Sequence, residues 1–192
     1  MALRNAMFQS WMRVMAGVER RPCTPAIRTL CASTDDVVSL PRPAVPKTLD
    51  QLKKEFPAHI TMQVQFSELD AMAHVNNTKY FTWFETLRVQ EFSSGIEPNF
   101  SFTPVGIKPV VGDTWCRFRR PVEMYDKVTV GLRVVDLKPD RGEFKHVYAV
   151  WSSDQETVAA MGGCTVVVCD FDQGGRRTAI PDRWLPSLES QR

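Results

Sequence analysis

The chain has 192 residues, of which 43% are hydrophobic and 24% charged, and its formal net charge is +2 at pH 7. This composition excludes collagen-like, wholly disordered and disulfide-scaffold proteins, and so small a charge does not favour a nucleic-acid-binding protein. No apolar run approaches the roughly 20 residues that a membrane-spanning helix needs, so we expect no transmembrane segment. The cysteines are odd in number and lack metal-ligand spacing, which predicts reduced thiols and no metal site. They are Cys23, Cys31, Cys116, Cys164 and Cys169.

Residues 1–33 form a basic segment that contains five arginines and one acidic residue, Glu19, for a net charge of +4. Its apolar residues recur at helical spacing and share one face of the predicted helix. A basic amphipathic helix with few acids is typical of an organelle presequence, which predicts a protein of the mitochondrial matrix, with a plastid as the alternative. The same pattern fits a helix that is retained and docks on a partner. Sequencing the N-terminus of the mature protein separates the two.

A proline-rich stretch over residues 34–57 follows the basic segment. Pro41, Pro43, Pro46 and Pro57 each lack a backbone N–H and fix φ, so they interrupt regular structure. We interpret this stretch as a linker with one short helix around Thr48–Phe56. The folded domain, residues 58–192, is then expected to begin near Ala58.

A strand, a turn and a helix open this domain. Apolar and polar residues alternate from Met62 to Ser67, as in a half-buried strand. After the turn, Asn76 and Asn77 supply side chains of the type that caps a helix N-terminus. From Thr78, bulky apolar residues recur at helical spacing until Ser94 and Gly95 end the helix. These residues are Tyr80, Trp83, Phe84, Leu87 and Phe92. So much aromatic bulk on one helix indicates burial against a sheet.

Four more stretches of alternating residues follow, around 115–119, 128–134, 144–150 and 158–168. Short turns separate the last three, and short connections between consecutive strands require antiparallel pairing. The sequence therefore predicts an α+β domain in which an antiparallel sheet of about five strands wraps around one long apolar helix.

The segment from Phe66 to Tyr80, continuing to Glu85, resembles the 4-hydroxybenzoyl-CoA thioesterase family of hotdog-fold proteins. In that family an aspartate closes the first strand, and a short turn leads into a long helix. The resemblance extends over roughly Thr61–Trp184 and implies a hotdog fold that hydrolyses acyl-CoA thioesters to free acid and coenzyme A without a metal or redox cofactor. The same superfamily also contains dehydratases and non-catalytic members.

The resemblance implies that Asp70 is the catalytic carboxylate, acting as nucleophile or as general base. It also implies that the backbone N–H of Asn77 polarises the thioester carbonyl, as suits the positive end of a helix dipole. His74 is a candidate second catalytic group. Each has a structural alternative: Asp70 can cap the turn, His74 can be structural, and Asn77 can simply cap the helix. Glu85 is a weaker catalytic candidate, and an ion pair with Arg88 is its alternative.

Coenzyme A carries phosphates, so its binding site needs cations. The resemblance roughly matches four residues to phosphate-contacting positions, namely Arg141, Lys145, Arg176 and Arg177. Acyl carrier protein carries the same arm and is the alternative acyl donor. A lone hotdog unit leaves a sheet edge and half a pocket exposed, so we expect a homodimer or tetramer.

Two functions from different classes follow. The first is an acyl-CoA thioesterase of the mitochondrial matrix. The alternative is a catalytically silent hotdog subunit with a structural or acyl-binding role in a larger mitochondrial assembly. A hydratase or dehydratase is a third and weaker hypothesis, because those enzymes usually depend on a different His/Asp or His/Glu arrangement.

Overall fold

The computed structural model describes residues 44–98, 100–101, 103 and 105–192. The described residues belong to one compact unit, Pro43–Arg192. The predictions for residues 1–33 and for the first part of the linker lie outside the described residues and stay predictions.

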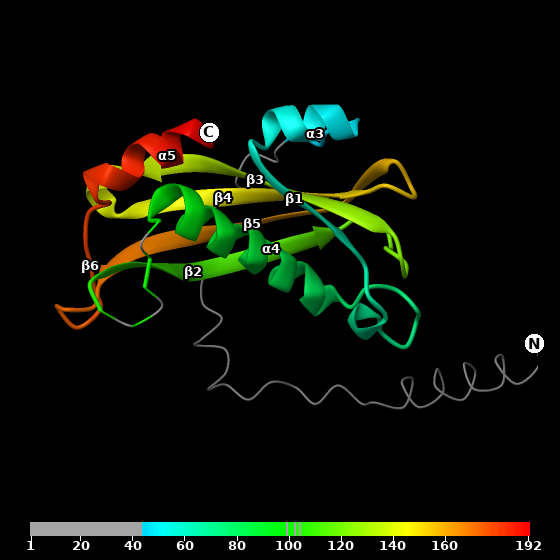
Figure 1. The fold of residues 1–192 in the computed structure, drawn as a ribbon, viewed down its shortest axis with the longest axis horizontal. Helices are drawn as coiled ribbons and strands as arrows, with labels where there is room; N and C mark the ends of the chain where they lie inside the picture. Colours follow the sequence, from blue (N-terminus) through cyan, green and yellow to red (C-terminus); the bar gives the residue numbers. More distant parts are fainter. Residues whose placement is uncertain (1–43, 99, 102, 104) are drawn as a thin grey trace, which may run out of the picture. The chain divides into compact units, whose positions relative to one another are not determined.

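The described unit is an antiparallel sheet with one long helix across one of its faces (Figure 1). The strands are β1 (Ala58–Gln63), β2 (Ile107–Phe118), β3 (Lys127–Lys138), β4 (Glu143–Ser152), β5 (Thr157–Asp170) and β6 (Arg176–Arg177). Their order is β1-β3-β4-β5-β2, and β6 pairs with the end of β5. This is the α+β hotdog architecture that the sequence predicts, with the short β6 as an addition.

The long helix is α4 (Asn77–Glu91), and a π-helical turn, η3 (Phe92–Ile96), continues it. Its buried residues are Tyr80, Trp83, Phe84 and Leu87, the aromatic and apolar face that the spacing predicts. Phe84 stacks on Tyr148 of β4, with ring centroids 4.4 Å apart. The main core therefore lies between α4 and the facing side of the sheet.

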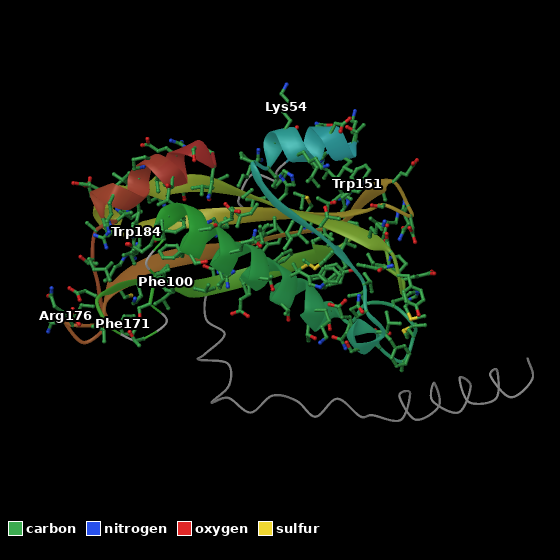
Figure 2. The ribbon with its side chains drawn as sticks, in the orientation of Figure 1. Lys54, Phe100, Trp151, Phe171, Arg176 and Trp184 are labelled. Atoms are coloured by element: carbon green, nitrogen blue, oxygen red, sulfur yellow. The ribbon has the colours of Figure 1, made fainter. Side chains whose placement is uncertain are left out.

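The chain closes with η5 (Asp182–Trp184) and α5 (Leu185–Ser190), which cover one end of this core. Trp184 is fully buried and packs edge-on against Phe92 (Figure 2). Its indole N–H donates to Glu97 at 2.7 Å. The core thus continues past the last strand.

A second, smaller core lies on the opposite face of the sheet, under the short helix α3 (Leu49–Glu55). The helix is present where the sequence predicts it, but it is not part of a loose linker. Leu52 and Phe56 are fully buried against the outward side chains of β4, and Gly131 of β3 leaves room for Phe56, since a Cβ there would lie 2.7 Å from that side chain. The packed domain therefore begins before Ala58.

Among the described residues, none of the helices is both long and apolar enough to cross a membrane.

Candidate active site

The turn between β1 and α4 is held in place by Glu68. Its two carboxylate oxygens accept from different parts of the chain: Oε2 accepts from the Gln65 N–H at 2.9 Å, and Oε1 from the Trp83 indole at 2.8 Å. The Glu68 carbonyl also accepts from the N–H of Asn76 at 2.8 Å. One residue of a short 3-10 turn, η2 (Phe66–Glu68), thus ties the turn to the helix that follows it.

Asp70 lies at the exposed side of this turn. Its N–H donates to the carbonyl of His74 at 2.8 Å, and its Oδ1 accepts from the N–H of Met72 at 2.8 Å. The capping role that the sequence analysis gave as the alternative is therefore real. It occupies one carboxylate oxygen, and no protein hydrogen bond to Oδ2 is found among the described residues. Capping and catalysis are compatible here.

The N-terminus of α4 supplies hydrogen-bond donors beside Asp70. Asn76 is the N-cap, and its Oδ1 accepts from the N–H of Thr78 at 3.0 Å. Asn77 is the first residue of the helix, where N–H groups have no intrahelical acceptor and the helix dipole is positive. The geometry gives Asn77 an N–H that can stabilise developing negative charge.

Asp70 and Asn77 line the same cavity of about 280 Å³. The remaining lining residues come from the turn, helix α4, the end of β2 and the segment that follows it, and they are Val75, Tyr80, Phe118, Arg119, Arg120 and Pro121. Burial raises the pKa of Tyr80 to about 12, so its hydroxyl stays protonated at neutral pH. The cavity therefore combines a carboxylate, helix N-terminal donors and two arginines.

Arg119 and Arg120 are lining residues that the sequence analysis did not select. Their backbone N–H groups both donate to the carbonyl of Ala159, at 2.8 and 3.1 Å. Because two successive N–H groups share one acceptor, the regular pairing of β2 with β5 ends here. The side chains of Arg119 and Arg120 are both exposed. The available signal was two consecutive arginines, followed by Pro121, after a stretch of alternating residues.

His74 does not line this cavity. Its backbone forms an isolated bridge with Glu123, and the neighbouring N–H of Val75 donates to the carbonyl of Val122 at 2.8 Å. The structure therefore gives His74 a role in holding the turn. Glu85 and Arg88 lie elsewhere, on a second cavity, and no ion pair within 4 Å joins them.

Arg141 and Arg177 line a third cavity, of about 390 Å³, at the β6 end of the domain. Arg177 is ion-paired with Glu143 at 2.7 Å, and Lys145 with Asp136 at 3.1 Å. Arg176 extends from the same end (Figure 2). Two of the four phosphate-binding candidates are thus already neutralised by acids of the same chain.

These candidates are far from Asp70 within one chain. Phe118, on the Asp70 cavity, pairs with Ala160 of β5, whereas Arg177 pairs with Cys169. Nine residues of β5 separate these points, which is about 30 Å at about 3.4 Å per residue. The turn before α4 and β6 accordingly lie at opposite ends of the described unit (Figure 1). One subunit does not bring the two groups together.

Comparison with known proteins identifies the family. A family model described as the thioesterase-like superfamily matches residues 64–188, which include the turn, helix α4 and all the larger strands after it. The chain belongs to the thioesterase-like superfamily. The match contains Asp70, Asn77 and the rest of the cavity lining.

The individual relatives share less than a third of their residues with this chain. A curated protein of Aquifex aeolicus (strain VF5), named as a presumed esterase, is 29% identical over 127 residues, covering 66% of this chain and 94% of that protein. A thioesterase of Thermus thermophilus, solved with coenzyme A and Zn, is 26% identical, with a TM-score of 0.62, and the match covers 72% of this chain and 96% of that one. The 1,4-dihydroxy-2-naphthoyl-CoA thioesterase of Synechocystis shares the fold at 13% identity, with a TM-score of 0.59 over 68% of this chain and 93% of that one.

Among the described residues, no group of three or more His, Cys, Asp or Glu side chains is arranged to hold a metal ion.

Proposed function

We propose that this thioesterase-like protein hydrolyses acyl-CoA thioesters, and that it does so with Asp70 and the N-terminus of α4. The observation that carries the proposal is that the Asp70 carboxylate and the first residue of α4, Asn77, line one cavity. Thioester hydrolysis needs a carboxylate to attack or to activate water, and donors for the oxyanion that develops on the carbonyl. Both requirements are met by the chain itself, so the proposed reaction requires no metal or redox cofactor.

In the general-base form, the Asp70 carboxylate takes a proton from water while the water oxygen bonds to the thioester carbon. The carbonyl electrons move to oxygen, where the N–H of Asn77 stabilises the charge. The carbonyl then re-forms, the C–S bond breaks, and the coenzyme A sulfur leaves with a proton. In the nucleophilic form, a carboxylate oxygen of Asp70 bonds to the thioester carbon, the C–S bond breaks, and the coenzyme A thiolate leaves and takes up a proton. Water then hydrolyses the resulting anhydride, which releases the free acid and restores the Asp70 carboxylate.

Within the superfamily we place the chain with enzymes of the 4-hydroxybenzoyl-CoA thioesterase type. The support is the position of Asp70 in the turn that leads into α4, on the cavity, whereas Glu85 lies in the middle of the helix on a different cavity. Acyl carrier protein presents the same thioester arm and is an alternative donor for the same chemistry.

We further propose that two copies pair through β2. This strand has twelve residues, forms one edge of the sheet, and exposes Val110 and Val111. Antiparallel pairing of two β2 strands would bring the start of one strand toward the end of the other. The cationic β6 end of one copy would then approach the Asp70 cavity of the second, which supports a phosphate-binding role for Arg141 and Arg176 toward a ligand of the second copy.

Replacement of Asp70 tests the proposal. Asp70→Asn should lower kcat for acyl-CoA hydrolysis by about 10²–10⁴-fold, the usual contribution of such a group. The release of free thiol from a series of acyl-CoA chain lengths gives the rate. Asp50→Asn removes the same charge from exposed α3 on the opposite face of the sheet and should keep the wild-type rate.

An Asp70→Asn variant as active as the wild type would refute the assignment of Asp70. A wild-type protein that hydrolyses none of the acyl-CoA series would favour the silent hotdog subunit, with an acyl-binding or structural role in a mitochondrial assembly.

A further inference from the structure

A second cavity, of about 380 Å³, lies between helix α4 and the sheet. Its lining comes from the second half of α4, the loop after it and strands β2, β4 and β5, and most of it is aliphatic or aromatic, as in Val89, Phe92, Phe100, Phe144 and Val166. A dry cavity of about 150 Å³ is enough for a benzene molecule. This cavity is therefore large enough for a six-carbon chain or a ring.

Two charged residues lie in this otherwise apolar lining, Arg88 and Glu85, and the Glu85 carboxylate acts on Arg88 electrostatically without an ion pair within 4 Å. Arg88 is half-buried, and its Nη1 donates to the Tyr148 hydroxyl at 3.2 Å, with a longer contact of 3.9 Å to the Cys164 sulfur. No carboxylate of the described residues is within 4 Å of its guanidinium. A guanidinium has five N–H donors, and those on Nε and Nη2 have no protein acceptor in the described part of the chain.

His146 adds a second unmatched polar atom to the same lining. Its side chain is only 4% exposed, and Nδ1 lies 3.3 Å from the Tyr148 hydroxyl. Its Nε2 is buried with no hydrogen-bond partner among the described residues. Buried polar atoms are nearly always paired in folded proteins, so an unpaired atom beside a cavity indicates a missing ligand or water.

We infer that this cavity receives the far end of the acyl group and that Arg88 binds a carboxylate at that end. The preferred substrates are then thioesters of dicarboxylic acids, with an apolar chain between the thioester and the terminal carboxylate. The guanidinium of Arg88 is half-buried and no carboxylate of the described residues contacts it, so its planar donors can receive the two oxygens of a ligand carboxylate. The Phe92, Phe100 and Phe144 side chains would pack on the chain between the two polar ends.

This inference rests on the proposed function. It requires the proposed β2 dimer, in which the substrate would reach from the Asp70 cavity of one copy into the Arg88 cavity of the other. In one copy, Val111 on this cavity and Phe118 on the Asp70 cavity are seven residues apart on β2, about 24 Å. Antiparallel pairing of two β2 strands would bring the Val111 region of one copy toward the Phe118 end of the other. A thioester at Asp70 of one copy can then extend its acyl group into this cavity of the second copy.

Two substrates of equal carbon number test the inference. Adipoyl-CoA ends in a carboxylate and hexanoyl-CoA in a methyl group. The wild-type protein should have at least a tenfold higher kcat/KM for adipoyl-CoA. Equal values, or a preference for hexanoyl-CoA, would overturn the inference while leaving the proposed hydrolysis in place.

Substitution of Arg88 then assigns the preference to this residue. Arg88→Met should lower kcat/KM for adipoyl-CoA by tenfold or more, mainly through KM, and keep the value for hexanoyl-CoA within about threefold, a span of about 0.65 kcal/mol. Arg88→Lys keeps the charge and should recover part of the adipoyl-CoA value. Lys54→Met removes a positive charge from α3, away from the cavity (Figure 2). It should leave kcat/KM unchanged for both adipoyl-CoA and hexanoyl-CoA.

Equal losses for both substrates in Arg88→Met would contradict the assignment and indicate a structural role. If Arg88→Met does not fold, Arg88→Gln retains a donor toward Tyr148 and replaces it in the same comparison. The retained hexanoyl-CoA activity reports correct folding in either case.

A binding measurement separates failure of this inference from failure of the proposed function. Coenzyme A thioethers cannot be hydrolysed, and they can be made with a six-atom chain that ends in a carboxylate or in a methyl group. If the protein hydrolyses neither thioester, calorimetry with the two thioethers still decides the inference. Tighter binding of the carboxylate form, lost in Arg88→Met, supports it, and equal binding of the two forms refutes it.

Discussion

His146, Tyr148 and Cys164 are buried under helix α4, and together with the half-buried Arg88 of that helix they form a polar group. Burial lowers the pKa of His146 to about 3, and the positive charge of Arg88 adds to the effect. Burial also raises the pKa of the Cys164 thiol and of the Tyr148 hydroxyl. At neutral pH these three groups are uncharged, so Arg88 is the one charged member of the group.

The low pKa of His146 predicts an acid sensitivity of the fold. Between about pH 6.5 and pH 3, the unfolded chain binds a proton at this residue that the folded chain does not. The free energy of unfolding therefore falls as pH falls, by at most about 1.4 kcal/mol per pH unit from this residue. In His146→Gln this contribution disappears, and urea unfolding between pH 7 and pH 4.5 should show a shallower dependence on pH.

His59→Gln is the matched control, because His59 lies on β1 and is exposed. It should retain the wild-type dependence on pH. A His146→Gln variant with the wild-type slope would show that His146 does not stay uncharged in the folded protein.

At the scale of the elements, the approach of α4 to the sheet depends on Gly162 of β5. A Cβ at this position would lie 2.4 Å from the ring of Phe84 and 2.9 Å from the carbonyl of Trp115. The ring of Phe84 occupies this space and stacks on Tyr148. The absence of one side chain thus sets how closely the helix and sheet pack.

Gly162→Ala should lower the free energy of unfolding by about 1–3 kcal/mol, the usual cost of overpacking a core. Urea denaturation gives the value. In the double variant with Phe84→Leu, the ring that the added methyl group would contact is absent. The double variant should therefore lose less free energy of unfolding than the sum of the losses in the two single variants.

Gly95→Ala is the control, since a Cβ at that position would meet nothing within 4 Å beyond its own chain neighbours and the local helix backbone. Additive losses in the double variant would show that the Phe84 ring is not what limits the space at Gly162.

Local patterns in the sequence predicted the elements that build the site. The capping asparagines and the aromatic spacing of α4 depend on neighbours in the chain, and both were found in the structure. The first strand, in contrast, lies earlier than the alternation from Met62 to Ser67 predicted: it is Ala58–Gln63, and Phe66–Glu68 form a 3-10 turn in which the Phe66 side chain is exposed. The packing of α3 was not predicted, because it depends on Gly131, which lies about 75 residues after Phe56 in the chain and leaves space for its ring. Proline content alone suggested a linker there.

The site itself was predictable only in part, for the same reason. Asp70 and Asn77 are seven residues apart, and one turn brings them to the same cavity. Arg119 and Arg120 reach it through the pairing of β2 with β5, and Arg88 meets Tyr148 sixty residues away. Contacts of this kind leave no local pattern.

At the scale of the whole described unit, one long edge of the sheet has no partner. Strand β2 bonds to β5 on one side, and its other side presents twelve residues with exposed valines. Long apolar edge strands in native proteins are normally covered or paired. This edge supports the homodimer that we propose.

A charge on this edge should weaken the pairing. Val110→Lys is expected to shift the protein from dimer toward monomer in light scattering at micromolar concentration, because unpaired lysines protect edge strands from association. Acyl-CoA hydrolysis should fall with the dimer fraction. Val105→Lys, an exposed position just before β2, is the control and should leave both properties unchanged. A wild-type monomer with full activity would rule out the shared site.

Glu68 holds two parts of the candidate site in position. Its side chain and carbonyl fasten both the segment that carries the carboxylate and the residue before the first helical N–H. Because one residue holds both parts, loss of the Glu68 side chain would release the segment that carries Asp70 and the start of α4 together, and the arrangement that the proposed reaction needs would be lost as a unit.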